Sequence, residues 1–146
     1  MDLLSSTFAI SASALRAERI RIDTVATNLA NAHTTQTVEG GPYRRKTVLF
    51  AARALDEFGQ MLDDLGRSAR PAGVDVTDVV EDATPPRMVF DPGHPDANPE
   101  GYVAHPNVDP IVEMVDLQAA TRAYEANVQV VNATRRMSDA ALSIIG

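Results

Sequence analysis

The sequence contains no cysteine and no tryptophan, and aromatic residues make up only 5% of its 146 residues. The absence of cysteine excludes disulfide bonds, thiol catalysis and cysteine-bound zinc. A core with so few aromatic side chains must rely on Ala, Val, Leu and Ile, which favours packed helices over a thick β-sandwich. Hydrophobic residues still reach 45%, which excludes a wholly disordered chain.

Segments that would direct the chain into a membrane are also missing. No stretch is long and apolar enough to span a bilayer. The N-terminus is unlike a cleavable signal peptide, because Asp2 stands where a basic residue belongs and Ser5, Ser6 and Thr7 interrupt the apolar run. We therefore expect no direct membrane insertion, and export only by a route that needs no cleaved signal.

Charge is unevenly distributed along the chain, whose net charge is −7. Residues 1–55 carry 7 basic and 4 acidic groups, residues 56–116 carry 3 and 14, and residues 117–146 carry 3 and 2. The segments thus have net charges of +3, −11 and +1. An acidic centre argues against a nucleic-acid partner, because phosphate binding depends on Lys and Arg. We interpret the basic cluster Arg44-Arg45-Lys46 as a solvated strand or loop.

Helix breakers are absent from both ends of the chain. All nine prolines lie between Pro42 and Pro110, and neither Pro nor Gly occurs in 1–39 or 111–145. Both ends can therefore form long helices, whereas the centre cannot. The sequence predicts a mainly α fold with a small β-containing insert. We expect an N-terminal helical region at 1–35, an irregular α/β insert at 36–108 and a C-terminal helix at 109–146, with the helices packed as a coiled-coil-like hairpin.

A seven-residue apolar repeat marks the N-terminal helix. Phe8, Leu15, Ile22 and Leu29 are each seven residues apart, which is typical of a coiled-coil-like stripe. The repeat predicts a helix from about residue 3 to 30.

The C-terminal helix has its own start signal and its own repeat. Asp109 is a good N-cap, and Pro110 is tolerated at the first helical position. The predicted stripe contains Met114, Leu117, Thr121, Tyr124, Val128, Val131, Leu142 and Ile145. Another face carries small residues, namely Ala119, Ala123, Ala126, Ala133 and Ala140. A helix that is apolar on two faces needs two neighbours, and we favour other copies or related chains over a third helix of this chain.

The insert contains several short apolar runs. Strands are predicted at 43–50, 73–80, 88–90 and 101–103, and a short helix at 55–65. Such short strands cannot build a large core. The insert is therefore expected to pack on the helices or on neighbouring chains.

Candidate catalytic and metal-binding residues are weak. His94 and His105 flank a loop with several Asp residues, but no pair has the close spacing of metal ligands. His33 follows the first helix and is interpreted as a turn or cap residue. We predict no enzyme, no catalytic, cofactor-binding or metal-binding residue, and no cofactor. A small peptidoglycan hydrolase, suggested only by the carboxylates and the two histidines, remains an alternative.

Three sequence blocks carry a family resemblance. They are 25–34; then 39–46 with 85–87 and 91–96; and finally 101–103, 106–108, 113–116 and 122–127. The first and third resemble the axial proteins of the bacterial flagellum, the family of rod, hook and hook-associated proteins. The second resembles the proximal rod proteins in particular. His33 departs from the pattern, because Asn is common at its position.

The resemblance implies a structural subunit of the flagellar basal-body proximal rod. Such a subunit assembles with copies of itself and with other rod proteins into a helical tube that transmits torque and conducts exported subunits. It would be exported by the flagellar type III apparatus without signal cleavage. It would lie in the periplasm on the MS-ring and export-gate base. A soluble coiled-coil adaptor or secretion chaperone is the alternative that shares the helix pattern.

The predicted assembly interface combines the helix stripes with the Asn-rich block. Asn28 and Asn31 are expected to cap the end of the first helix, with direct subunit recognition as the alternative. The full predicted interface is Phe8, Leu15, Ile22, Asn28, Leu29, Asn31, Leu117, Tyr124, Val128, Val131 and Leu142.

Overall fold

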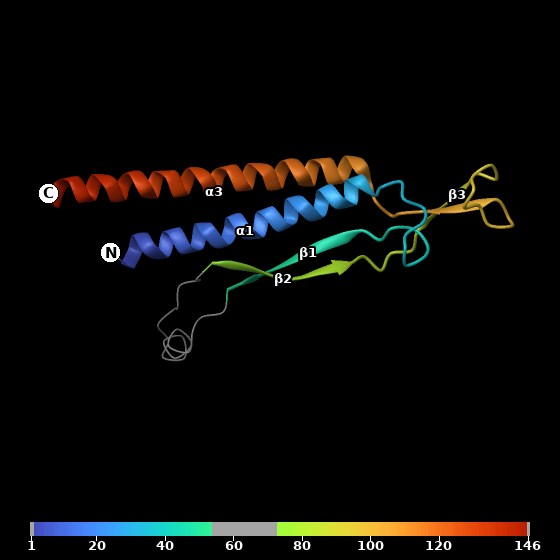
Figure 1. The fold of residues 1–146 in the computed structure, drawn as a ribbon, viewed down its shortest axis with the longest axis horizontal. Helices are drawn as coiled ribbons and strands as arrows, with labels where there is room; N and C mark the ends of the chain where they lie inside the picture. The colour runs from blue at the N-terminus through green and yellow to red at the C-terminus, as the bar shows by residue number, and fades with distance from the viewer. Residues whose placement is uncertain (1, 54–72, 146) are drawn as a thin grey trace. The chain divides into compact units, whose positions relative to one another are not determined.

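The computed structural model describes residues 2–53 and 73–145. Within these residues, one long helix lies near each end of the chain and four short strands lie between the helices in the sequence (Figure 1). The elements in order are α1 (Asp2–Ala30), β1 (Lys46–Ala52), β2 (Val74–Glu81), β3 (Arg87–Phe90), β4 (Tyr102–His105) and α3 (Pro110–Ile145). The predicted fold of two terminal helices with a small β-containing insert is confirmed. The short helix predicted at 55–65 lies outside the described residues.

Contacts divide the chain into two compact units, and both helices contribute to both. The first unit contains Met1–Ile20, Leu49–Asp78 and Thr121–Gly146. The second unit contains Arg21–Val48 and Val79–Ala120.

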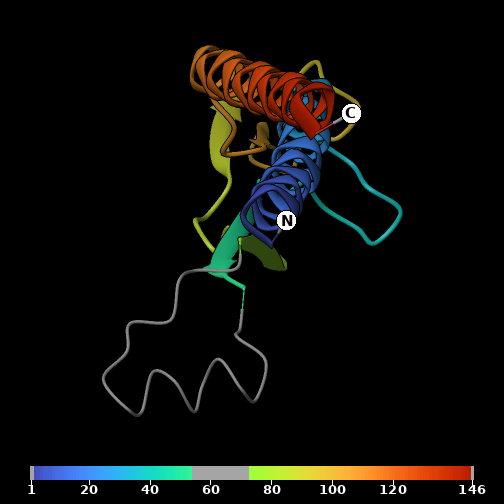
Figure 2. The same ribbon diagram turned by 90° about the vertical axis from the view of Figure 1, so that its left-hand side faces the viewer.

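In the second unit, local hydrogen bonds explain where α3 begins and where α1 ends. The Asp109 carboxylate accepts a hydrogen bond from the Ile111 backbone N–H at 2.9 Å, which confirms Asp109 as the N-cap of α3. At the end of α1, the Asn31 side-chain amide donates to the Thr27 carbonyl at 2.9 Å, as expected for a residue that closes a helix. The loop that follows, cyan in Figure 2, runs out from α1 and returns toward β1.

Strands β3 and β4 form an antiparallel pair in the second unit. Val89 lies opposite Val103, and Phe90 lies opposite Tyr102. Val103 is buried, whereas the rings of Phe90 and Tyr102 stand on the exposed face in an edge-to-face pair with centroids 5.3 Å apart. Gly101 has φ +83°, and a Cβ there would approach Phe90 Cε2 to 2.8 Å, so this turn requires glycine.

Strands β1 and β2 form the other two-stranded sheet. In the second unit, the Asp82 backbone N–H donates a 2.7 Å hydrogen bond to the Arg45 carbonyl, next to the first residue of β1. In the first unit, the Arg53 backbone N–H donates a 3.0 Å hydrogen bond to the Gly73 carbonyl, next to the last residue of β1. These pairings run in opposite directions along the two segments, as in an antiparallel ladder.

A close contact in the first unit joins α1 to the start of β2. The Ser13 hydroxyl donates to the Ile10 carbonyl at 2.7 Å and accepts from the Val74 backbone N–H at 3.1 Å. Gly73 has φ +129°, and a Cβ there would overlap Ser13 Oγ. The strand can approach the helix this closely because position 73 has no side chain.

The buried face of α3 agrees with the predicted stripe at some positions and differs at others. Leu117, Tyr124, Val128 and Val131 are half-buried, in line with the seven-residue pattern. Three stripe residues, Met114, Thr121 and Leu142, are instead exposed. Glu113 and Ala120, which precede the first two, are fully buried. The cause is local, because Glu113 turns inward to meet polar partners from α1 and the segment before β1.

Candidate functional site: a buried polar network and an exposed apolar surface

The centre of the second unit is a polar network around Asn28, whose side chain has no exposed surface. Its amide Nδ2 donates to the Lys46 carbonyl at 2.8 Å and to Glu113 Oε2 at 3.0 Å. Its Oδ1 accepts from the Lys46 backbone N–H and from the Tyr43 hydroxyl, each at 2.9 Å. The side chain therefore uses both donors and both acceptor positions, and it joins α1, β1 and α3.

The pairing between Asn28 and Lys46 copies a sheet interaction. One side-chain amide both donates to and accepts from the backbone of a single strand residue. Opposed residues of an antiparallel pair exchange bonds in the same way. The end of α1 thus fixes the first residue of β1 in place.

Glu113 is the charged member of the network and is completely buried. Arg45 Nε donates to Glu113 Oε1 at 2.6 Å, and the Asn28 amide donates to the other carboxylate oxygen. Both oxygens of the buried charge are therefore compensated, as a buried charge requires. Asp116 extends the network outward, with ion-pair distances of 3.6 Å to Arg45 and 3.9 Å to Arg21.

The position of Tyr43 in this network changes the pKa of its hydroxyl. Burial raises the pKa of its hydroxyl above the ordinary 10.0, and the negative charges of Glu113 and Glu81 raise it further. The hydroxyl therefore stays protonated and keeps donating to Asn28 well into alkaline solution.

The network corrects two interpretations of the sequence. Asn28 does not cap α1, because its four bonds go to β1, α3 and Tyr43 and none goes to the end of its own helix. The basic cluster is also not simply solvated. Arg45 pairs with Glu113, and Lys46 lies 3.9 Å from Glu81, while Arg44 is the exposed member.

The three sequence blocks of the resemblance meet in this network. Asn28 comes from the first block, Tyr43 and Arg45 from the second, and Glu113 from the third. Sequence reasoning missed this convergence because Asn28 and Glu113 are 85 residues apart. The available signal was a single charge, Glu113, inside an otherwise apolar run at the start of a helix.

An exposed apolar surface lies on the same turns of α3. We call it the α3 surface; it consists of Ile111, Val112, Met114 and Val115, which are 69%, 50%, 51% and 61% exposed. Glu113 points inward between them, so its neighbours point outward. Four adjacent large apolar side chains in solvent are unusual for a helix that has no further contacts, and such surfaces mark protein interaction sites.

The predicted interface residues occupy different environments. Asn28 is buried, and Leu142 is exposed at 62%. The others are half-buried: Phe8, Leu15, Ile22, Leu29, Asn31, Leu117, Tyr124, Val128 and Val131. The α3 surface was not in the predicted set, although the apolar run 111–115 could have indicated it. The role of the predicted residues in assembly remains a prediction.

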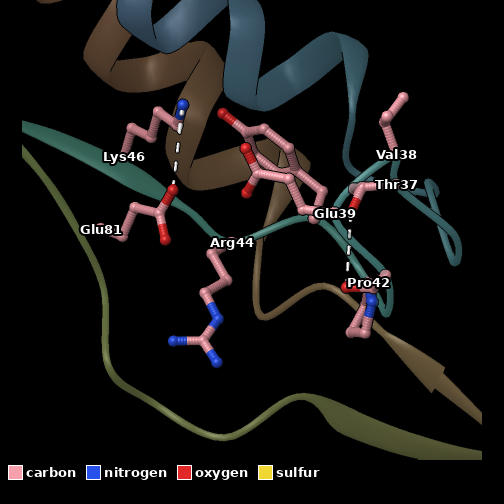
Figure 3. A pocket seen from close by; sticks show the side chains of 9 residues that line it. Thr37, Val38, Glu39, Pro42, Arg44, Lys46 and Glu81 are labelled. Atoms are coloured by element: carbon pink, nitrogen blue, oxygen red, sulfur yellow. Dashed lines mark hydrogen bonds and ion pairs between the residues drawn. The ribbon is translucent and has the colours of Figure 1, made fainter.

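A hollow of about 460 Å³ opens in the second unit beside the loop after α1 (Figure 3). Its Thr37 hydroxyl donates to the Gly40 carbonyl at 3.4 Å, and its Lys46 pairs with Glu81. Arg44 points away from that pair in Figure 3. The two hydroxyls that line this hollow donate to the Gly40 carbonyl and to Asn28 Oδ1, and neither acceptor is a general base.

The three histidines hold structural positions. His33 lies in the turn after α1, as predicted. His94 Nδ1 accepts a 3.1 Å hydrogen bond from the Asp96 backbone N–H, and its ring stands edge-on to His105 with centroids 6.5 Å apart. In residues 2–53 and 73–145, no three His, Asp or Glu side chains gather closely enough to hold a metal ion. Over the same residues, no helix has the length and apolar character needed to cross a bilayer.

Long terminal helices, an internal polar network and exposed apolar helix residues are typical of structural proteins that associate through their helices. Comparison with known proteins narrows this class. Residues 8–35 match the family described as flagella basal body rod protein. Residues 100–144 match the family described as flagellar basal body rod FlgEFG protein C-terminal.

Full-length relatives agree with these matches. The flagellar basal-body rod protein FlgC of Bacillus subtilis is 47% identical over 141 residues, covering 92% of this chain and 93% of the relative. FlgC of Borreliella burgdorferi is 38% identical over 148 residues, covering 97% of each chain. FlgC of Escherichia coli O6:H1 is 40% identical over 134 residues, covering 92% of each.

The chain belongs to the FlgC family of flagellar basal-body rod proteins. The resemblance inferred from the three sequence blocks is confirmed. The prediction of a structural, non-enzymatic protein of the flagellar basal body is confirmed as well, because the relatives are rod proteins.

Proposed function

We propose that this chain is a subunit of the proximal rod. It assembles head-to-tail with copies of itself and with other rod proteins into a helical tube that transmits torque and conducts exported subunits. Contacts between non-identical faces generate such open helical assemblies when the rotation does not close. The α3 surface is the observation that carries the proposal, since it leaves Ile111, Met114 and Val115 in solvent on a long helix.

The proposed subunit has an inner helical domain and an outer domain. The inner domain combines residues 1–35 and 109–146 as a coiled-coil-like hairpin, and residues 36–108 form the outer domain. Support comes from the 29-residue and 36-residue lengths of α1 and α3 and from the seven-residue spacing of their half-buried side chains. Many small contacts along such helices distribute a torque load.

The proposal also covers location and export, for which membership of the rod family is the support. The subunit would be exported by the flagellar type III apparatus without loss of a signal peptide. It would join the rod in the periplasm above the MS ring and export gate. Long helices that complete their packing only in the assembly should have disordered ends in the free monomer.

Basal-body composition tests the proposed function. Mass spectrometry of purified flagellar basal bodies should detect this chain, and electron microscopy of a strain that lacks it should show no rod. Normal rods in that strain, with the chain absent from basal bodies, would overturn the proposal. A soluble dimer absent from basal bodies would support the adaptor or chaperone alternative.

Two substitutions test the surfaces. Val115→Lys places a charge on the α3 surface and should abolish rod formation, while the purified chain keeps its urea midpoint. Gln36→Lys, at an exposed loop position, is the matched control and should form rods normally. Tyr124→Ala should weaken assembly, and unchanged assembly with an intact fold would remove Tyr124 from the interface.

A further inference from the structure

The seven-residue repeats of the two helices would, by themselves, allow more than one register between them. On α1 the half-buried Phe8, Leu15, Ile22 and Leu29 repeat every seven residues. On α3 the inward positions also repeat every seven residues, and they carry Glu113, Ala120, Asn127 and Thr134. Sliding one helix by seven residues places repeat positions opposite the neighbouring helix again, so the spacing alone does not specify the alignment.

The polar network removes this ambiguity in the second unit. In the observed alignment the Asn28 amide and Arg45 both reach the carboxylate of Glu113. A shift of α3 by seven residues would bring Ala120, which has no acceptor, to the place of Glu113. The Asn28 amide and Arg45 Nε would each lose the acceptor that Glu113 provides, and the loss is costly for the fully buried amide.

We infer that Asn28 and Glu113 are positioning residues that select the register of α3 against α1. A single buried polar residue selects register in coiled coils in the same way, at a cost in stability. Replacing a buried polar group by an apolar one of similar size often keeps or raises stability. A register role and a purely stabilising role therefore predict different results for an apolar replacement.

Distance measurements between two spin labels separate these roles. Because the chain has no cysteine, Ala26→Cys on α1 and Gln118→Cys on α3 introduce the sole labelling sites, both at exposed positions. The labelled full-length chain should give one narrow distance by pulsed electron paramagnetic resonance. With Asn28→Leu and Glu113→Leu added, a second population should appear, its axial separation changed by about 10 Å, the rise of seven helical residues.

The matched control replaces a polar residue at the same repeat position outside the network. The Asn127 amide donates only to the Ala123 carbonyl of its own helix, at 2.9 Å. Asn127→Leu should therefore retain the single distance. A single native distance in the Asn28→Leu/Glu113→Leu chain would overturn the inference.

A relocation variant tests the inference in the opposite direction. Glu113→Ala combined with Ala120→Glu moves the carboxylate by seven residues and should move the whole distance distribution to the shifted value. Retention of the original distance would overturn the inference. Loss of helical circular dichroism in both multiple variants would also overturn it, because the network would then be required for folding itself. None of these readouts depends on rod formation, so the result stands apart from the proposed function.

Discussion

The two units differ in the side chains that their helices bury. In the second unit, a fully buried carboxylate, a buried amide and a guanidinium join α1, β1 and α3 through directional bonds. In the first unit, the buried positions of α1 and α3 carry small side chains, namely Ser11, Ser13, Ala17 and Thr134. Directional polar contacts specify one arrangement, whereas small side chains allow close approach and specify less.

The comparison also extends to what each unit leaves exposed. Large apolar side chains of the first unit remain in solvent, among them Ile10, Val130, Met137 and Leu142. The second unit exposes the α3 surface but buries its charged centre. Both units therefore leave apolar helix side chains in solvent, and the second unit also has a buried charged centre.

The largest expected effect breaks the second unit at its centre. Asn28→Asp removes two donors and places a second carboxylate against Glu113. We expect a loss of about 3–5 kcal/mol in the free energy of unfolding, the cost of an uncompensated buried charge. Urea unfolding followed by circular dichroism measures it. Asn132→Asp, at an exposed position of α3, should change the midpoint little.

The next largest effect is expected from a substitution that disrupts the close contact between α1 and the start of β2 in the first unit. Gly73→Ala adds a Cβ that overlaps Ser13 Oγ at a backbone φ of +129°, so the Ser13 side chain or the strand must shift. We expect a loss of about 1–3 kcal/mol from backbone strain. Gly93→Ala is the matched control, because its Cβ would meet only Asp91 Oδ1 at an ordinary 3.6 Å. Equal unfolding midpoints for the two variants would contradict the expectation.

The free energy of unfolding measured over a series of pH values tests how Tyr43 contributes to the stability of the second unit. Since the folded chain raises the pKa of this hydroxyl above 10.0, the folded state binds its proton more tightly than the unfolded state. Its contribution to stability is complete below pH 10.0 and is lost as the pH rises through the folded-state pKa. Tyr43→Phe should lower stability at neutral pH and flatten the alkaline decline. Parallel alkaline curves for the two proteins would argue against the raised pKa.

The smallest effect concerns an exposed ion pair of the first unit. Arg53 binds Asp75 through two bonds of 2.9 and 3.1 Å, and this hydrogen bonding lowers the pKa of the carboxyl below 3.8. Asp75→Asn should reduce stability slightly at neutral pH, and the difference should vanish as the pH falls through the folded-state pKa. A difference that persists in strong acid would point to a role other than the ion pair.

Local sequence signals predicted the helices well. Absent Pro and Gly, an Asp-Pro start and a seven-residue repeat predicted helices at 3–30 and 110–145, against the observed Asp2–Ala30 and Pro110–Ile145. The four strands were predicted within a few residues of their bounds. These features depend on neighbours in the sequence, so a single chain reveals them.

The network was not predicted, because it depends on contacts between distant segments. The hydrophobic repeat favoured Met114 as a buried residue, but Arg45 and Asn28 supply bonds that make Glu113 the inward residue instead. A repeat cannot report a partner that lies 68 or 85 residues away. The α3 surface was missed for the same reason, since it follows from the rotation that Glu113 imposes.

The pairing of Asn28 with Lys46 has a further consequence for solubility. Short sheets with open edges invite extra strands from other molecules, which leads to aggregation. At the first residue of β1, the outward-facing N–H and carbonyl are already occupied by the Asn28 amide. A strand from another molecule therefore finds no free backbone groups to pair with at that position. The Asn28 side chain in this way protects one position of the sheet edge from intermolecular pairing.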